Sequence, residues 1–196
     1  MFKFPPDRPA QVAITSDEIV GARFDKEDKS KAVQFRRDGM TFSVLKGYRN
    51  WDGIRSTARD FWQLFLELVG TQVAPAIGRL AVRYINVIDV PATSDFDHYL
   101  TAGPRIPSTL PQGLTTFLQR LVVPFTEEQA SAIITQALEP QVELVVPTVL
   151  DIDVSSVVGS IDGGNAEVWN RLDRLRFIKN RVFFSFLTPK SLDMYR

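Results

Sequence analysis

The sequence has no cysteine in its 196 residues and only one histidine. Without cysteine the chain has no disulfide, no thiol nucleophile and no cysteine metal ligand, and this fits a reducing compartment. The histidine, His98, falls in a predicted short helix at residues 95–100 with no recognisable orienting partner. General-base catalysis needs such a partner, so we expect His98 to be a surface residue.

The chain also has no excess of positive or negative charge. Lys and Arg number 23, Asp and Glu number 23, and the formal net charge is zero. A sequence-indifferent nucleic-acid binder is usually basic, so this balance argues against that class but not against a local basic patch. No apolar run is long enough to span a bilayer, and the N-terminus has no secretory leader pattern. We therefore expect a cytoplasmic protein with no membrane contact.

Cofactor motifs are absent as well. The sequence holds no Gly-Lys-Ser/Thr phosphate loop and no dinucleotide glycine fingerprint, so we predict no cofactor. The apolar fraction of 44% and the charged fraction of 23% are typical of a globular protein of one domain or two small ones.

The clearest local pattern lies in residues 32–46. Two alternating runs flank Asp38-Gly39, which is the strongest short signal for a β-hairpin with a type I′ turn. The opposite pairs predicted by a two-residue loop here are Phe35–Phe42 and Val33–Val44. This arrangement places the apolar side chains on one face of the hairpin and the polar ones on the other.

A helix and a further strand are predicted next. Residues 51–69 carry apolar side chains at helical spacing, with Asn50 as the N-cap. Residues 77–90 alternate with apolar side chains on both faces, which is typical of a central strand. Arg83 then lies on a half-apolar face and needs a partner. We expect an ion pair with Asp151 or Asp153, and the alternative is an arginine that holds a ligand.

The second half repeats this combination of strands and a helix. Strands are predicted at residues 113–125, 130–138 and 142–154, with Pro147 marking a break or an edge in the third. A glycine loop at 157–164 and a helix at 166–187 follow, and the basic side chains of the helix, Lys179 among them, are expected outside its apolar stripe. The predicted fold class is α+β, with antiparallel sheets and amphipathic helices packed on one face. We predict two similar halves, ββαβ at residues 1–91 and βββα at residues 113–196, joined by a proline-rich connector at residues 92–112.

Two sets of residues carry the candidate chemistry. Asp151 and Asp153 project to the same strand face, where they would hold Mg²⁺ or Mn²⁺ if further oxygens converged, or would form ion pairs with Arg83 and Arg176. No third ligand has recognisable spacing, so we predict no metal site. Tyr48, Arg49 and Trp51 place aromatic rings among positive charge, and Arg36 adds to a possible basic sheet face; this mixture is used to stack unpaired bases.

Short motifs in both halves resemble a known family. They are Trp51, Arg83-Tyr84-Ile85-Asn86-Val87-Ile88 with Pro91, Leu150-Asp151-Ile152-Asp153-Val154, and the helix end Phe186-Leu187-Thr188. Over about residues 30–190 the chain resembles a sporadically distributed family of bacterial hypothetical proteins of unknown function. The resemblance implies a bacterial, cytosolic protein from mobile-element or antiviral-defence gene neighbourhoods, and it implies no catalytic residue. Family members are longer at the N-terminus, which implies that the first half of this chain starts late.

From these observations we expect a non-enzymatic binding or adaptor protein that acts through contacts with a protein partner or a second copy. A nucleic-acid-binding protein, or a metal-dependent nuclease that uses Asp151 and Asp153, stays open as the alternative. The candidate ligand- or partner-binding residues are Arg83, Tyr84, Asn86, Asp151, Asp153, Trp51, Arg36 and Arg49.

Overall fold

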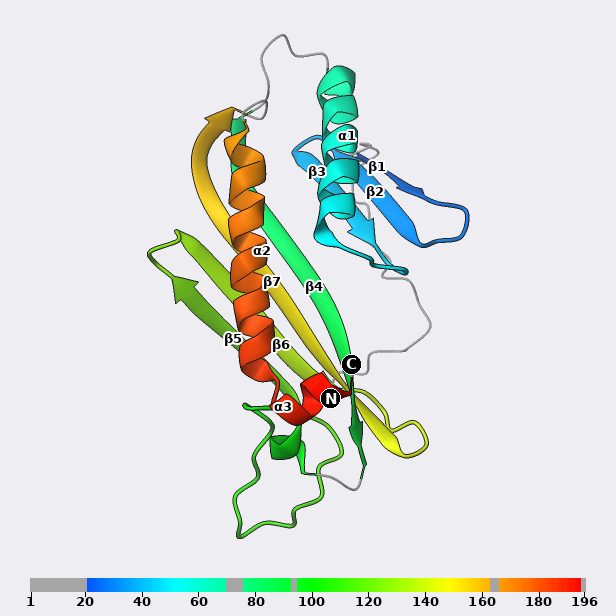
Figure 1. The fold of residues 1–196 in the computed structure, drawn as a ribbon, viewed down its shortest axis with the longest axis vertical. Helices are drawn as coiled ribbons and strands as arrows, with labels where there is room; N and C mark the ends of the chain where they lie inside the picture. The colour runs from blue at the N-terminus through cyan, green and yellow to red at the C-terminus, as the bar shows by residue number, and fades with distance from the viewer. Residues whose placement is uncertain (1–20, 70–75, 93–94, 163–165, 195–196) are drawn as a thin grey trace, which may run out of the picture. The chain divides into compact units, whose positions relative to one another are not determined.

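The computed structural model describes residues 21–69, 76–92, 95–162 and 166–194. Within these residues the chain forms two antiparallel sheets and several helices, which confirms the predicted α+β class (Figure 1). The chain divides into two compact units, Met1–Gln72 and Val73–Arg196. Predictions about residues 1–20 fall outside the described residues. In the described chain no helix combines the length and the apolar character needed to cross a membrane.

The first unit is a three-stranded sheet followed by one helix. Its elements are β1 (Gly21–Asp25), β2 (Lys31–Arg36), β3 (Gly39–Val44) and α1 (Trp51–Val69), with strand order β1-β2-β3. Rings from the two sides meet, because Phe35 lies 6.0 Å from Phe65 and Phe42 lies 5.4 Å from Phe61, centroid to centroid. The predicted helix at residues 51–69 is confirmed, and its aromatic stripe packs on the sheet as core.

The hairpin between β2 and β3 differs from the predicted register. Phe35 pairs with Met40 and Val33 pairs with Phe42, because the loop consists of Arg37 and Asp38. Gly39 is the first residue of β3 and has φ 152°, so the glycine takes up its unusual backbone angle inside the strand and not within the turn. The pairing moves by an even number of positions, so the predicted apolar and polar faces are retained.

The second unit is a four-stranded sheet with a long helix on one face. Its strands are β4 (Ala76–Pro91), β5 (Leu118–Phe125), β6 (Ala130–Leu138) and β7 (Val145–Asp162), in the order β4-β7-β6-β5. Helix α2 (Glu167–Phe186) lies along β4 and β7 (Figure 1). The buried core on this inner face is formed by Leu80, Val82, Ile88, Val90, Ala132, Ile134, Leu150, Ile152 and Val154 together with Leu175, Ile178 and Val182 of α2.

Residues 92–112 belong to the second unit and close one end of its core. The 3-10 helix η1 (Phe96–His98) precedes Tyr99 and Leu100, which are buried, and Leu100 forms a bridge with Leu187. The short helix α3 (Pro189–Asp193) packs here, where the Ser191 hydroxyl donates to the Tyr99 carbonyl oxygen. The segment predicted to be a connector is therefore packed against the residues that follow the C-terminal end of α2.

Three details of the strands differ from the sequence prediction. β4, assigned to the first half, pairs with β7 and belongs to the second unit, so the division falls near residue 72. Within the described chain β4 is an edge strand, not the central strand predicted from its apolar faces. β7 runs through Pro147 and covers positions 157–162, which were expected to be loop; residues 163 and 164 lie outside the described residues.

Candidate binding surfaces

The face of the four-stranded sheet opposite α2, here called the outer face, is formed by odd-numbered residues of β4, β6 and β7 and even-numbered residues of β5. In the described part of the second unit no helix packs on it. Its exposed large apolar side chains are Ile85 (62% exposed), Val87 (52%), Leu118 (74%), Val122 (57%) and Val157 (80%). Antiparallel sheets commonly leave one face to solvent, but that face is then usually polar.

Charged pairs cross the centre of the outer face. Nε and Nη2 of Arg83 donate to the two carboxylate oxygens of Asp151 at 2.9 and 2.5 Å, and Arg79 Nη2 lies 3.6 Å from Asp153 Oδ2. The hydrogen bonds to Asp151 raise the pKa of the Arg83 guanidinium further above neutrality. The Asp151 side chain is only 17% exposed and that of Arg83 is 57% exposed. The expected ion pair is therefore present, with Asp151 as the partner.

This geometry bears on the metal alternative. Each of the two carboxylates proposed as metal ligands has a guanidinium beside it, which supplies the positive charge that a cation would otherwise provide. Among the residues that the structure describes, no group of three or more His, Cys, Asp or Glu side chains is placed to hold a metal ion. Asp153 Oδ1 is buried without a hydrogen-bond partner.

Tyr84 and Asn86 lie on the opposite, inner face of β4. The Asn86 amide donates to the Leu150 carbonyl oxygen at 3.0 Å, and the Tyr84 ring lies under the Lys179 ammonium, with Nζ 3.8 Å from the ring centroid. Alternation along the strand separates these two residues from Arg83. Of these candidate binding residues, Tyr84 and Asn86 therefore lie on the core face and Arg83 lies on the outer face, as strand alternation predicts.

Lys179 is the polar residue that sequence reasoning misplaced. It is only 8% exposed, although the charge pattern assigned it to the solvent side of α2. Burial, and secondarily repulsion from Arg176, lowers the pKa of Lys179 to about 8. A signal was present in the sequence, because Lys179 stands four residues after Leu175 and four before Phe183, within the apolar stripe.

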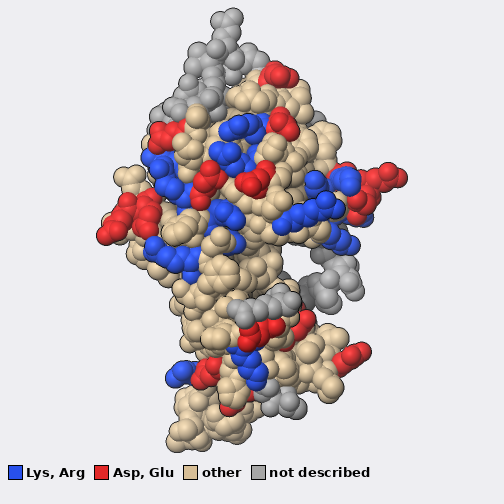
Figure 2. All heavy atoms as spheres, in the orientation of Figure 1, with Lys and Arg blue, Asp and Glu red and all other residues tan. Residues whose placement is uncertain are grey.

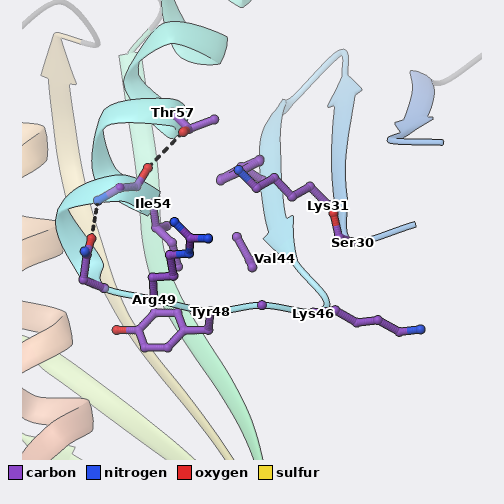
Figure 3. Close-up of a pocket in the computed structure, with 12 residues that line it drawn as sticks. Ser30, Lys31, Val44, Lys46, Tyr48, Arg49, Ile54 and Thr57 are labelled. Atoms are coloured by element: carbon purple, nitrogen blue, oxygen red, sulfur yellow. Dashed lines mark hydrogen bonds between the residues drawn. The ribbon is translucent and has the colours of Figure 1, made fainter. Parts of the chain in front are cut away.

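A separate basic pocket lies within the first unit (Figure 3). It has a volume of about 490 Å³, and its twelve lining residues include Lys31, Lys46, Tyr48 and Arg49 but no carboxylate. Lys31 comes to the pocket from β2 and Arg49 from the segment before α1, whereas the Lys46 side chain extends away (Figure 3). Asn50 accepts a hydrogen bond from the Gly53 amide at 2.8 Å, which confirms the predicted N-cap.

The other members of the predicted basic and aromatic set are not in this pocket. Trp51 is 8% exposed and belongs to the core, so its ring is not presented for stacking. Arg36 binds Asp38 at 2.9 and 2.8 Å beside the hairpin loop. On the face shown in Figure 2, cationic and acidic side chains lie side by side, so that face presents no continuous basic surface.

Helix α2 carries a second exposed apolar feature, formed by Phe177 and Phe184, which are 66% and 56% exposed. Residues seven apart lie on the same side of a helix, so the two rings form one outward ridge.

The motifs behind the family resemblance lie mainly on β4 and β7, which are adjacent in the sheet. The pairing places Arg83-Tyr84-Ile85-Asn86 beside Leu150-Asp151-Ile152-Asp153, so residues far apart in the chain form one structural element. This adjacency gives the motifs a common location but assigns them no activity, and the resemblance stays a prediction. No protein-family model, no curated protein and no solved structure matches the chain.

Proposed function

We propose that the protein is a non-enzymatic binding module whose contact surface for a protein partner is the outer face of the four-stranded sheet. The observation that carries this proposal is the set of exposed apolar side chains around the Arg83–Asp151 pair on a face that no described helix of this unit covers. The balanced charge and the absence of cysteine favour a cytoplasmic protein.

The chemistry of the outer face favours a protein over a small molecule. Burying apolar surface contributes about 25 cal/mol per Å², so several exposed Val, Ile and Leu side chains on a flat sheet can drive association. Arginine is enriched in protein interfaces, so exposed apolar side chains that surround Arg83 have a composition found in such interfaces. The Arg83–Asp151 pair, already formed in the unbound chain, would meet a partner without first being ordered.

Site-specific photo-crosslinking tests the proposal. Benzoylphenylalanine placed at Val122 or Leu118 of β5 should yield a discrete crosslinked protein in the native host, because both positions are exposed on the outer face. The same group at Arg174, an exposed position of α2, is the matched control and should yield none. The crosslinked band is then identified by mass spectrometry, and Val122→Asp should abolish crosslinking from Leu118.

Two outcomes would contradict the proposal. One is the absence of any crosslink from β5 under conditions where a known interacting pair is crosslinked. The other is crosslinking from Phe177 alone, which would place the interface on the α2 ridge.

A second candidate function is binding of single-stranded nucleic acid at the basic pocket of the first unit. The observation that favours it is a lining that contains Lys31, Arg49 and the exposed Tyr48 but no carboxylate. Fluorescence anisotropy with a labelled single-stranded oligonucleotide should show salt-sensitive binding that Lys31→Ala with Arg49→Ala weakens at least tenfold. Arg23→Ala, which removes an arginine already bound to Asp25, is the control. Binding unchanged by the double variant would exclude the pocket.

A further inference from the structure

β4 has one edge that no other strand of the described chain occupies. The strand spans 16 residues, and β7 is its only partner among the strands that the structure describes. A free edge presents a row of backbone N–H and C=O groups and is a template for pairing with another chain. The length of β4 makes this edge longer than that of an average strand of about 5–6 residues.

The middle of β4 lacks the features that protect natural edge strands, such as lysine, proline or a bulge. The register irregularity lies between Ile77 and Arg79 and the only proline of β4 is Pro91, so residues 80–90 contain none of these three features and carry two charged side chains, Arg83 and Asp89. Both faces of this stretch carry apolar side chains, which is the composition of a strand with neighbours on both sides. The sequence of β4 is therefore typical of a central strand, whereas the described residues of one chain supply only one neighbouring strand.

The side chains at equal distances on either side of Asn86 complement each other along β4. Two copies of β4 can be laid antiparallel with Asn86 opposite Asn86 of the second copy. The residues that then face each other across the two-fold axis are Ile85 and Val87, Arg83 and Asp89, Tyr84 and Ile88, and Val82 and Val90. Every pair is either apolar with apolar or cation with anion, which is the pattern that stabilises neighbouring antiparallel strands.

Neighbouring registers lose this match. If the axis passes through Ile85, Arg83 faces Val87 of the second copy; if it passes through Val87, Ile85 faces Asp89. Each places a charge against an apolar side chain. The pattern therefore selects one register, as alternation along a strand generally does.

The charges are available for this pairing. Asp89 is exposed and has no ion-pair partner among the described residues. Arg83 uses Nε and Nη2 on Asp151, and its guanidinium carries five N–H donors in all, so others are left for a second carboxylate.

We propose that two copies of this chain associate through antiparallel pairing of their β4 edges, centred on Asn86. The two sheets become one continuous sheet about a two-fold axis, with both α2 helices on the same side and both outer faces on the other. The inference does not depend on the proposed partner surface, because it concerns the edge of the sheet. The crosslinking experiment from β5 probes the outer face near the opposite edge strand, so the two proposals can fail independently.

The absence of cysteine allows a direct test of the register. Side chains opposite each other on antiparallel strands have Cβ atoms about 4.5–5.5 Å apart, close to the distance that a disulfide needs. Mixing Ile85→Cys with Val87→Cys protein under mild oxidation should give a covalent dimer joined between positions 85 and 87. Mixing Ile85→Cys with Ala81→Cys, which lie far from each other in the proposed register, is the matched control and should give little.

Charge reversal tests the same pairing without oxidation. Asp89→Arg places like charges opposite each other twice per dimer and should raise the dimer dissociation constant at least tenfold in sedimentation equilibrium. Asp60→Arg, on the surface of α1, should leave it unchanged. A wild-type chain that stays monomeric at all concentrations would overturn the inference, as would a dimer unaffected by Asp89→Arg or equal crosslinking in the control mixture.

Discussion

The ammonium group of Lys179 on α2 lies 3.8 Å from the centre of the Tyr84 ring on β4. A buried cation in this position is stabilised by the face of the ring but has lost most of its water. The two effects oppose each other; burial, with repulsion from Arg176 as the second cause, lowers the pKa of Lys179 to about 8.

This balance predicts that stability rises with pH. Below pH 8 both the folded and the unfolded chain hold the Lys179 proton, and the cost of burying the charge is present in full. Between pH 8 and the ordinary value of 10.5 the folded chain loses the proton first, so the free energy of unfolding increases, by roughly 1–2 kcal/mol after allowance for the ring contact. Lys179→Met should be more stable than wild type at pH 7 by a similar amount.

The comparison of pH profiles isolates this residue from other groups that titrate in the same range. Urea unfolding at pH 7 and pH 10 should show a smaller increase for Lys179→Met than for wild type. Lys190→Met, which removes an exposed lysine over the Tyr99 ring, should keep the wild-type increase. Equal increases for wild type and Lys179→Met would show that Lys179 is not the group responsible.

The Arg83–Asp151 pair should respond unequally to loss of either partner. Arg83→Ala leaves a largely buried carboxylate without its donor and should lower the free energy of unfolding by about 1–2 kcal/mol. Asp151→Ala leaves an arginine that is more than half exposed and can return to water, so about 0.5 kcal/mol is expected. Urea unfolding of both single variants and the double variant measures the coupling, and equal losses would contradict the assigned burial.

Replacing the buried Gln136 by an apolar residue should stabilise the protein. It is 1% exposed on the inner face of β6, and neither its Nε2 nor its Oε1 has a hydrogen-bond partner. An unpaired buried polar group costs about 1–3 kcal/mol, so Gln136→Leu should stabilise the second unit by about that amount. Thermal unfolding provides the measurement, with the exposed Gln112→Leu as control. A loss of stability would indicate that the Gln136 amide is paired in solution.

The N-cap of α1 gives a prediction for the first unit. Asn50→Ala removes the acceptor for the Gly53 amide and should destabilise this unit by about 1 kcal/mol. Asn50→Asp should preserve the cap. Hydrogen exchange at the amides of the first turn of α1 should accelerate in the alanine variant alone, and unchanged exchange would show that the hydrogen bond contributes nothing.

Local patterns in the sequence were enough to predict much of the architecture. Residues 51–69 form the predicted helix, and Val33, Phe35 and Phe42 share the predicted face, because helical and strand periodicity are properties of neighbouring residues. The hairpin register was wrong because Gly39 uses its backbone freedom one position later than a type I′ turn requires. The pairing of Arg83 with Asp151 was expected, although which aspartate it binds depends on tertiary register.

The remaining errors have one physical cause: each concerns a residue whose environment is set by neighbours that lie far away in the sequence. Proline and glycine indicated breaks in β7, yet Pro147 lies just beyond the last residue paired with β6 and Gly159 lies where only β4 is alongside, so the strand continues through both. Apolar side chains on both faces of β4 predicted two neighbours, and the described chain provides one. The spacing of Lys179 within the apolar stripe indicates that it is buried, but the sequence of α2 does not reveal that the Tyr84 ring lies beneath it.

The pairing of β4 with β7 also sets the order in which this protein can fold as it leaves the ribosome. Arg83 and Asp151 are 68 residues apart in the chain, whereas β5 and β6 are joined by a short turn. The β5–β6 hairpin can therefore form before β7 has been synthesised to pair with β4, and long-range pairing of this kind is slow. During that interval the nascent chain exposes a long strand with apolar side chains on both faces, and at this stage we expect it to depend most on chaperones and to be most prone to aggregation.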